Sequence, residues 1–187
     1  MNTKESTRLS YVLETALAVF FKHGFRKTSI EDIAQAAGIS RQGIYLHYKN
    51  KDEIFRAAIQ KTLDDGLEAV EAVLLNADLK LEEKLFGALD EWFGRHAGLF
   101  QPDASDLAAQ SERVLGEAVE HSNIRFQRKI EAVILSSSEQ TERMKNQAAT
   151  IVDILYACAL TWKHSLGSRQ EFSDKLRAAI RLCCRDL

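Results

Sequence analysis

The sequence predicts an all-α protein with an N-terminal three-helix helix-turn-helix domain and a C-terminal helical domain. Nine glycines and one proline in 187 residues leave long stretches free of helix-breaking residues. In these stretches apolar residues recur three or four positions apart, which is the spacing of one face of an α-helix. Between residues 28 and 48, two short predicted helices are separated by a turn that contains a glycine. That arrangement is the pattern of a helix-turn-helix.

The first predicted helix is amphipathic and ends at Gly24, because glycine adopts the left-handed backbone that often follows a helix. Its apolar face consists of Leu9, Val12, Leu13, Ala16, Leu17 and Phe20. The Thr28-Ser29-Ile30-Glu31 run then predicts a capping box in which Thr28 and Glu31 satisfy each other's amides. The second helix ends at Gly38, and Ser40 is expected to cap a third helix that runs to about Tyr48.

Longer helices are predicted after a short break at residues 50–52. They cover about residues 51–76, 81–98, 104–120, 123–137, 142–165 and 170–185. The change from short to long helices places a domain boundary there, giving a domain of residues 1–50 and a domain of residues 51–187. The 51–76 helix is expected to act as a stiff connector between them.

Charge is unevenly distributed along the chain. The formal net charge is −2, but residues 1–55 hold eight Lys/Arg and six Asp/Glu, a net +2, which leaves −4 for the remainder. A basic segment attached to an acidic one is typical of a protein that binds a polyanion with one part. No apolar stretch approaches the roughly 20 residues of a membrane span. The first ten residues lack the apolar core of a signal peptide, so the protein is expected in the cytoplasm.

The sequence holds no motif of the common enzyme classes. There is no nucleophile elbow, no glycine-rich phosphate loop, and no ligand-like spacing among the five histidines. The three cysteines are an odd number and suggest reduced thiols rather than a disulfide framework. We therefore predict no catalytic residue, no cofactor and no metal site, and we do not expect an enzyme.

The start of the third helix carries side chains suited to reading DNA. An α-helix fits the major groove, where arginine bonds guanine and glutamine bonds adenine through two hydrogen bonds each. The residues in reach are expected to be Ser40, Arg41, Gln42 and Gly43, the last allowing close approach. Phosphate contacts are expected from Lys51 and Thr28, and Tyr45 and His47 are expected either to bond phosphate oxygens or to pack on a thymine methyl. The alternative is an ordinary solvated helix face, with Thr28 acting only as a cap.

The segment TSIEDIAQAAGISRQGIYLHYKNKDEIF resembles the DNA-binding domain of the TetR family of transcriptional regulators. The similarity extends over about residues 7–55 and includes Ala-Gly-Ile-Ser in the turn and Ile-Tyr-x-His-Tyr in the third helix. It implies that residues 28, 41–43, 45, 47 and 51 contact double-stranded DNA. It also implies a homodimer on a palindromic operator, usually a repressor released by a small molecule. An activator, a regulator that responds to a protein, or an all-α enzyme with a structural helix-turn-helix are the alternatives.

The last two helices are the expected dimer interface. The 142–165 helix is apolar on several faces, because Ile154, Tyr156 and Leu160 lie outside its main stripe. An apolar surface on several sides indicates burial on more than one side. The predicted interface residues are Ile151, Leu155, Cys158, Trp162, Leu176, Ile180 and Cys183. The alternative is that this helix lies at the centre of a monomer's core.

Aromatic residues near the end of the 81–98 helix are candidates for an effector pocket. Pockets are usually apolar and aromatic, with a few polar groups. The candidate residues are Trp92, Phe93, His96, Phe100 and Tyr156, with Asp153 as a further candidate on the same helix as Tyr156. An effector with few polar groups would suit them. Aromatic side chains at helical spacing are also common in plain cores, which is the alternative.

Overall fold

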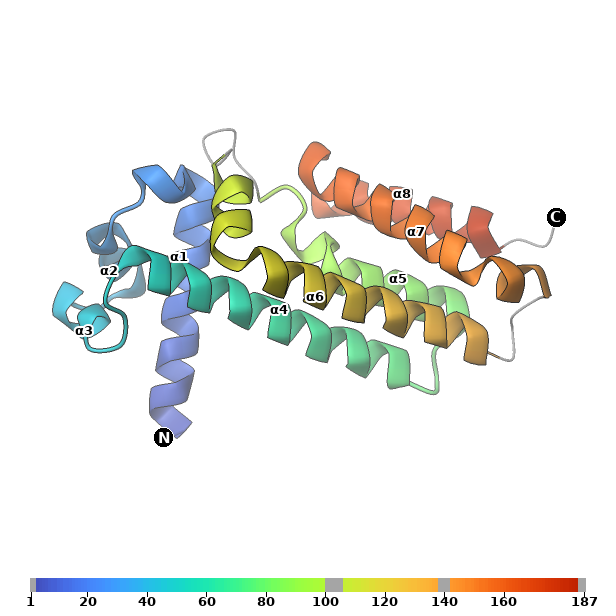
Figure 1. The fold of residues 1–187 in the computed structure, drawn as a ribbon, viewed down its shortest axis with the longest axis horizontal. Helices are drawn as coiled ribbons and strands as arrows, with labels where there is room; N and C mark the ends of the chain where they lie inside the picture. The colour runs from blue at the N-terminus through green and yellow to red at the C-terminus, as the bar shows by residue number, and fades with distance from the viewer. Residues whose placement is uncertain (1–2, 100–105, 138–141, 185–187) are drawn as a thin grey trace. The chain divides into compact units, whose positions relative to one another are not determined.

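The computed structural model describes residues 3–99, 106–137 and 142–184, and every regular element in these ranges is helical (Figure 1). The elements are α1 (Thr3–Lys27), α2 (Ile30–Ala37), α3 (Arg41–Tyr45), α4 (Lys51–Leu75), α5 (Leu81–Trp92), the short 3₁₀ helix η1 (Gly94–His96), α6 (Leu107–Ser136), α7 (Glu142–Ser165) and α8 (Arg169–Cys184). The predicted all-α fold is confirmed.

The chain forms two compact units. Unit 1 comprises Met1–Asp64 with Leu99–Glu120, and unit 2 comprises Asp65–Gly98 with His121–Leu187. Helices α4 and α6 each begin in unit 1 and end in unit 2. The domain boundary predicted at residue 50 lies at the start of α4 and stays a prediction.

The core of unit 1 is built around three phenylalanines from α1 and α4. The ring of Phe20 lies 5.6 Å from Phe25 and 5.1 Å from Phe55, centre to centre. Ile33 of α2 and Ile44 of α3 are buried in the same cluster, which fixes both short helices to this core. Leu107, the first residue of α6, is also a member, with 5% of its surface exposed.

The backbone of α1 is interrupted at Gly24, whose φ of 79° and ψ of 163° lie outside the helical region. The predicted end of the first helix is therefore the site of a break, and a short helical turn continues to Lys27. The predicted capping box was wrong by one residue. The Ser29 hydroxyl accepts from the Asp32 amide at 3.1 Å, and the Asp32 carboxylate accepts from the Ser29 amide at 2.8 Å.

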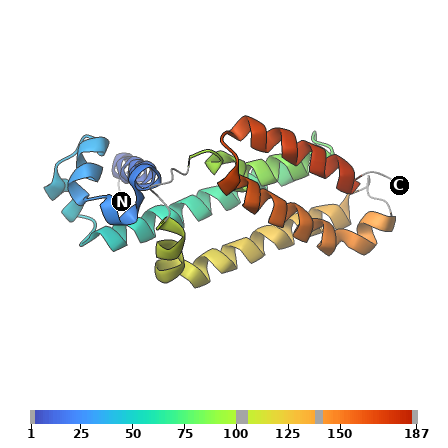
Figure 2. The same ribbon diagram turned by 90° about the horizontal axis from the view of Figure 1, so that it is seen from above.

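Unit 2 has an aromatic core, and its helices α7 and α8 pack against each other (Figures 1 and 2). The Trp92 and Phe126 rings are stacked at 5.1 Å, and Phe93 meets Tyr156 edge to face at 5.2 Å. Two predicted boundaries were wrong here. The helices expected over residues 104–120 and 123–137 form the single helix α6, because the residues between them hold neither glycine nor proline. Helix α5 ends at Trp92 rather than near Gly98.

Candidate functional site

Helix α3 is short, capped and anchored by one side chain. The Ser40 hydroxyl accepts from the Gly43 amide at 3.1 Å, so the predicted cap is confirmed. Ile44 is 1% exposed and holds the helix on unit 1. The regular helix ends at Tyr45, earlier than predicted, and hydrogen bonds from His47 N and Tyr48 N to Ile44 O close the turn at 3.0 Å each.

The outer surface of α3 and the turn after it is exposed and polar. The exposed residues there are Ser40, Arg41, Gln42, Tyr45, Leu46 and His47. Arg41 Nη2 donates to Tyr45 Oη at 3.1 Å, and this hydrogen bond is the main cause that raises the pKa of Arg41. The two side chains are four residues apart and therefore share one helix face. Five of the predicted DNA-contacting residues thus belong to one accessible surface.

Gly43 lies within this helix, and the fold itself does not require a glycine there. A Cβ at this position would meet only the Ser40 hydroxyl oxygen, at 3.4 Å, an ordinary contact distance. Gly38, in contrast, has a φ of 65° in the left-handed region, where a glycine is favoured. The fold of the free chain therefore does not explain why residue 43 is a glycine.

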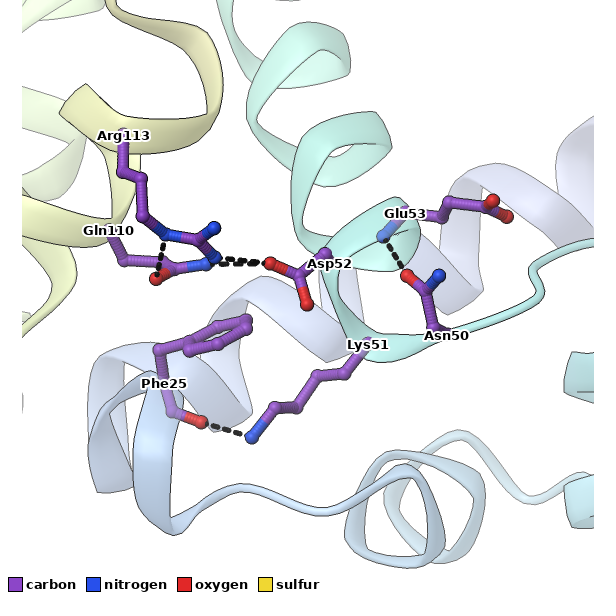
Figure 3. A network of polar contacts seen from close by, with 7 residues as sticks. All are labelled: Phe25, Asn50, Lys51, Asp52, Glu53, Gln110 and Arg113. Atoms are coloured by element: carbon purple, nitrogen blue, oxygen red, sulfur yellow. Dashed lines mark hydrogen bonds and ion pairs between the residues drawn. The ribbon is translucent and has the colours of Figure 1, made fainter.

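Thr28 and Lys51, the two other predicted phosphate contacts, are engaged inside unit 1. Thr28 is 2% exposed, and its hydroxyl donates to Gly24 O at 2.7 Å. The Lys51 ammonium donates to Phe25 O at 2.6 Å (Figure 3) and also to Thr28 O at 2.7 Å. It also lies 4.3 Å from the Phe25 ring centre, and burial lowers the pKa of Lys51. Both residues stabilise the chain between α1 and α2, and their contact with DNA stays a prediction.

Two further residues of unit 1, Leu46 and Asp106, lie at or support the α3 surface, and neither was predicted from the sequence. Leu46 is 82% exposed at the end of α3, an unusual position for a leucine, and it lies two residues after the buried Ile44. That spacing puts it off the apolar face, a signal that was available in the sequence. Asp106 accepts hydrogen bonds from the Phe25 and Arg26 amides. No local pattern links it to residues so distant in sequence.

The residues predicted for an effector site partly come together. Trp92, Phe93 and Tyr156 share one cluster with Phe126, which the sequence analysis had not included. Trp92 is 8% and Phe93 2% exposed, so their rings fill the interior of unit 2. Phe100 lies outside the described residues.

Two basic groups of unit 2 have strongly lowered pKa values. Burial, with the nearby charges of Lys163, Arg95 and Arg169, lowers the pKa of His96 to about 3. Burial also lowers the pKa of Lys163 to about 8. His96 is therefore neutral at pH 7.

A surface groove of about 200 Å³ lies between α6 and α7 of unit 2. It is lined by Ile124, Gln127, Arg128, Glu131, Ala149, Val152 and Asp153. Of the residues named as effector-site candidates, Asp153 contributes to this lining, whereas the aromatic candidates and His96 do not.

Four of the residues predicted for the dimer interface are between 0% and 5% exposed in the single chain and pack in its interior: Ile151, Leu155, Leu176 and Ile180. The dimer interface stays a prediction. Cys158, Trp162 and Cys183 are partly exposed. Among the described side chains of α7 and α8, the large exposed apolar ones are Ile154, Leu160 and Leu182, at 48%, 39% and 67%.

Among the described residues, no group of three or more His, Cys, Asp or Glu side chains is arranged to hold a metal ion. In the same ranges, none of the helices has the length and hydropathy needed to cross a membrane.

Comparison with known proteins gives a family match in the N-terminal segment and curated relatives that align with part of the chain. Residues 12–58 match the family described as "Bacterial regulatory proteins, tetR family". The chain is 38% identical over 71 residues to the uncharacterized HTH-type transcriptional regulator YfiR of Bacillus subtilis, covering 37% of this chain and 35% of that protein. It is 42% identical over 67 residues to the probable acrEF/envCD operon repressor of Escherichia coli K12, covering 30% of each. The chain thus aligns with about a third of the length of these curated relatives.

Solved structures are similar over nearly the whole chain. A TetR-like transcriptional regulator from Rhodococcus sp. RHA1 superposes with a TM-score of 0.64 at 23% identity, over 96% of this chain and 97% of that one. A transcriptional regulator from Aquifex aeolicus VF5 gives a TM-score of 0.65 at 17% identity, over 94% and 98%. At these identities the similarity is one of fold.

Proposed function

We propose that this chain, a member of the TetR family by its N-terminal domain and its fold, is a transcriptional regulator that binds a palindromic DNA operator as a homodimer. We propose further that it is a repressor released by a small, largely apolar effector. Such a regulator works on chromosomal DNA and therefore in the cytoplasm. The observation that carries the proposal is the exposed polar surface of α3, held on unit 1 by the buried Ile44.

The chemistry of that surface suits the major groove. Arg41 has donors left after its bond to Tyr45, and a guanidinium can donate twice to guanine O6 and N7. Gln42 is exposed beside it and can pair with adenine in the same way. Tyr45 and His47 are placed to reach phosphate oxygens, which fix register but carry no sequence information.

A palindromic operator follows from two copies of this surface. Two recognition helices must lie about 34–36 Å apart to enter successive major grooves on one side of the duplex. We propose that the outer sides of α7 and α8 join the two copies, through Ile154 and Leu182 with Cys158, Trp162 and Cys183. Exposed apolar side chains on adjacent helices are typical of such interfaces.

Release by an effector is supported by the aromatic cluster in unit 2. Trp92, Phe93 and Tyr156 offer apolar, aromatic surface, and His96 is a neutral polar group nearby in sequence. A ligand that weakens operator binding must itself be weakened by the operator, by the same free energy. An activator or a protein-responsive regulator would use the same surface on α3, whereas an enzyme would not need it.

The proposal is tested by selecting duplexes from a random-sequence pool with the purified full chain, and then titrating the enriched sequence at several salt concentrations. We expect a palindrome and an affinity that falls steeply with salt, because bound phosphates release counterions. The Arg41→Ala variant is the control and should enrich the palindrome less strongly than the wild type does. A pool that stays random after selection with the wild type would refute the regulator and leave the enzyme alternative open.

A further inference from the structure

A residue from the middle of the chain binds the backbone at the break in α1. The two carboxylate oxygens of Asp106 accept from the Phe25 amide at 3.0 Å and from the Arg26 amide at 2.8 Å. These residues are 81 and 80 positions apart in sequence, and all belong to unit 1. A helix break leaves backbone amides that need acceptors from outside the helix, and Asp106 supplies two of them.

The same peptide segment is held from its carbonyl side by Lys51. The ammonium donates to Phe25 O at 2.6 Å (Figure 3), and it donates to Thr28 O at 2.7 Å. Residues 25–28 are therefore fixed between a carboxylate on their amides and a cation on their carbonyls. Hydrogen bonds to charged groups are the stronger class of protein hydrogen bonds. This arrangement is called the 25–28 clamp below.

The start of α6 makes further contacts with the rest of unit 1 beside the clamp. Leu107 is buried in the core cluster that also contains Ile33 and Ile44. Gln110 Nε2 donates to Asp52 Oδ1 at 3.1 Å, and Arg113 pairs with the same oxygen (Figure 3). Asp52 directly follows Lys51 at the start of α4, so Gln110 and Arg113 join the first turns of α6 to the residue next to the clamp.

The clamp is connected to the DNA-facing surface by very few residues. Residue 28 is followed by Ser29, the N-cap of α2, and α2 is joined to α3 through the turn at Gly38. We propose that Asp106 is a positioning residue for operator recognition: by fixing residues 25–28 it sets the direction of α2 and, with it, of α3. The inference rests on the proposed function, since it concerns the same DNA-binding surface.

Simple electrostatics predicts that removing the charge of Asp106 strengthens DNA binding, which is the opposite of the effect expected from a positioning role. Asp106 carries a negative charge on the unit that is proposed to bind a polyanion. Removing that charge should by itself strengthen binding to any DNA, because repulsion of the phosphates falls. If Asp106 positions α2 and α3, the same change must instead weaken binding to the specific palindrome. The two effects are separated by comparing specific with non-specific DNA.

The test uses full-length Asp106→Asn, with Asp64→Asn as the matched control. Asp64 is exposed on α4 in the same unit, and its substitution changes the net charge equally. Affinity is measured for the selected palindrome and for a random duplex of equal length. We expect Asp106→Asn to lose about tenfold or more for the palindrome, the effect of one charged hydrogen bond, and nothing for the random duplex. Asp64→Asn should lose neither.

The inference is overturned if Asp106→Asn binds the palindrome as tightly as Asp64→Asn does. Hydrogen exchange at the Phe25 and Arg26 amides verifies the contact, and both should exchange faster in Asp106→Asn alone. If that variant does not fold, Asp106→Glu retains the charge on a longer side chain and is expected to show a smaller loss of the same kind; an unchanged specificity ratio in it would also refute the inference. A wild type that selects no palindrome would instead refute the proposed function.

Discussion

Arg41 and Tyr45 are joined on the exposed face of α3, with Nη2 donating to Oη at 3.1 Å and Cζ lying 5.4 Å from the ring centre. The contact orders two long side chains before any DNA is bound, which reduces the entropy lost on binding. A guanidinium has five N–H donors, so this hydrogen bond leaves enough for a base edge. We propose that the pair acts as one preformed element for recognising DNA.

Arg41→Ala is expected to weaken binding to the selected operator by about 1–3 kcal/mol, the value of one bidentate base contact. Tyr45→Ala should also weaken it strongly, and Tyr45→Phe less, because the ring remains. Fluorescence anisotropy with a labelled duplex measures both. Arg41 and Tyr45 are exposed, so the free energy of unfolding should change by less than about 0.5 kcal/mol. Wild-type operator affinity in both alanine variants would refute this reading surface.

Gly43→Ala should have opposite effects on stability and on DNA binding. Alanine in a helix is favoured over glycine by about 0.8–1 kcal/mol, and the new Cβ meets no atom closer than 3.4 Å. The free protein should therefore be more resistant to thermal unfolding. Operator affinity should fall, because the added methyl group holds α3 away from the groove floor. A variant that is more stable and binds equally well would contradict the close approach.

Leu46 is expected to contact a thymine methyl group. Its side chain is 82% exposed beside Tyr45, and apolar contact is how proteins recognise that methyl. Replacing single thymines of the operator by uracil removes only the methyl. At one position the wild type should lose affinity, and Leu46→Ala should be insensitive to the same replacement. Equal losses in both proteins at every position would exclude the contact.

His96 should reduce stability as the pH falls from about 6.5 to about 3. Its pKa is lowered to about 3 in the folded chain, so over this range the unfolded chain binds a proton that the folded chain does not. The free energy of unfolding then decreases by at most about 1.4 kcal/mol per pH unit from this group. Urea unfolding at a series of pH values should show a shallower decrease for His96→Gln. The exposed His121→Gln serves as the control and should follow the wild type.

The dimer is expected to depend on the outer side of α7 and α8. Ile154→Glu or Leu182→Glu places a charge on an exposed apolar position, 48% and 67% accessible in the single chain. Each variant should shift sedimentation toward the monomer and reduce operator affinity, because one recognition helix alone binds a half-site. Ile124→Glu, on α6 and 39% exposed, is the matched control. Dimers that persist in both variants would move the interface elsewhere.

Local chemistry explains what the sequence could predict. The Ser40 cap, the turn at Gly38 and the spans of α4 and α7 follow from residues adjacent in sequence, and each was placed to within one residue. The capping box was misplaced because Thr28 and Ser29 each precede an acidic residue by three positions. In the structure the Thr28 hydroxyl is bonded to Gly24 O, at the break in α1, and Ser29 is the cap instead.

Long-range packing explains what the sequence could not predict. Helical periodicity identifies the buried stripe of α7, but it does not state whether that stripe faces the same chain or another one. Ile151 and Leu155 face the interior of their own chain. The position of Asp106 against Phe25 likewise depends on tertiary structure alone, since nothing near either residue indicates the other.

The discontinuity of unit 1 has a practical consequence for engineering sensors from this chain. A hybrid regulator is usually designed as a DNA-binding domain fused to the ligand-binding domain of another protein. Here a graft of residues 1–64 alone would leave behind Asp106, which precedes α6, together with Leu107 and Arg113 of α6. A transferable DNA-binding unit must therefore include both segments of unit 1, Met1–Asp64 and Leu99–Glu120. The junctions with the recipient protein have to be matched at the second segment as carefully as at the first.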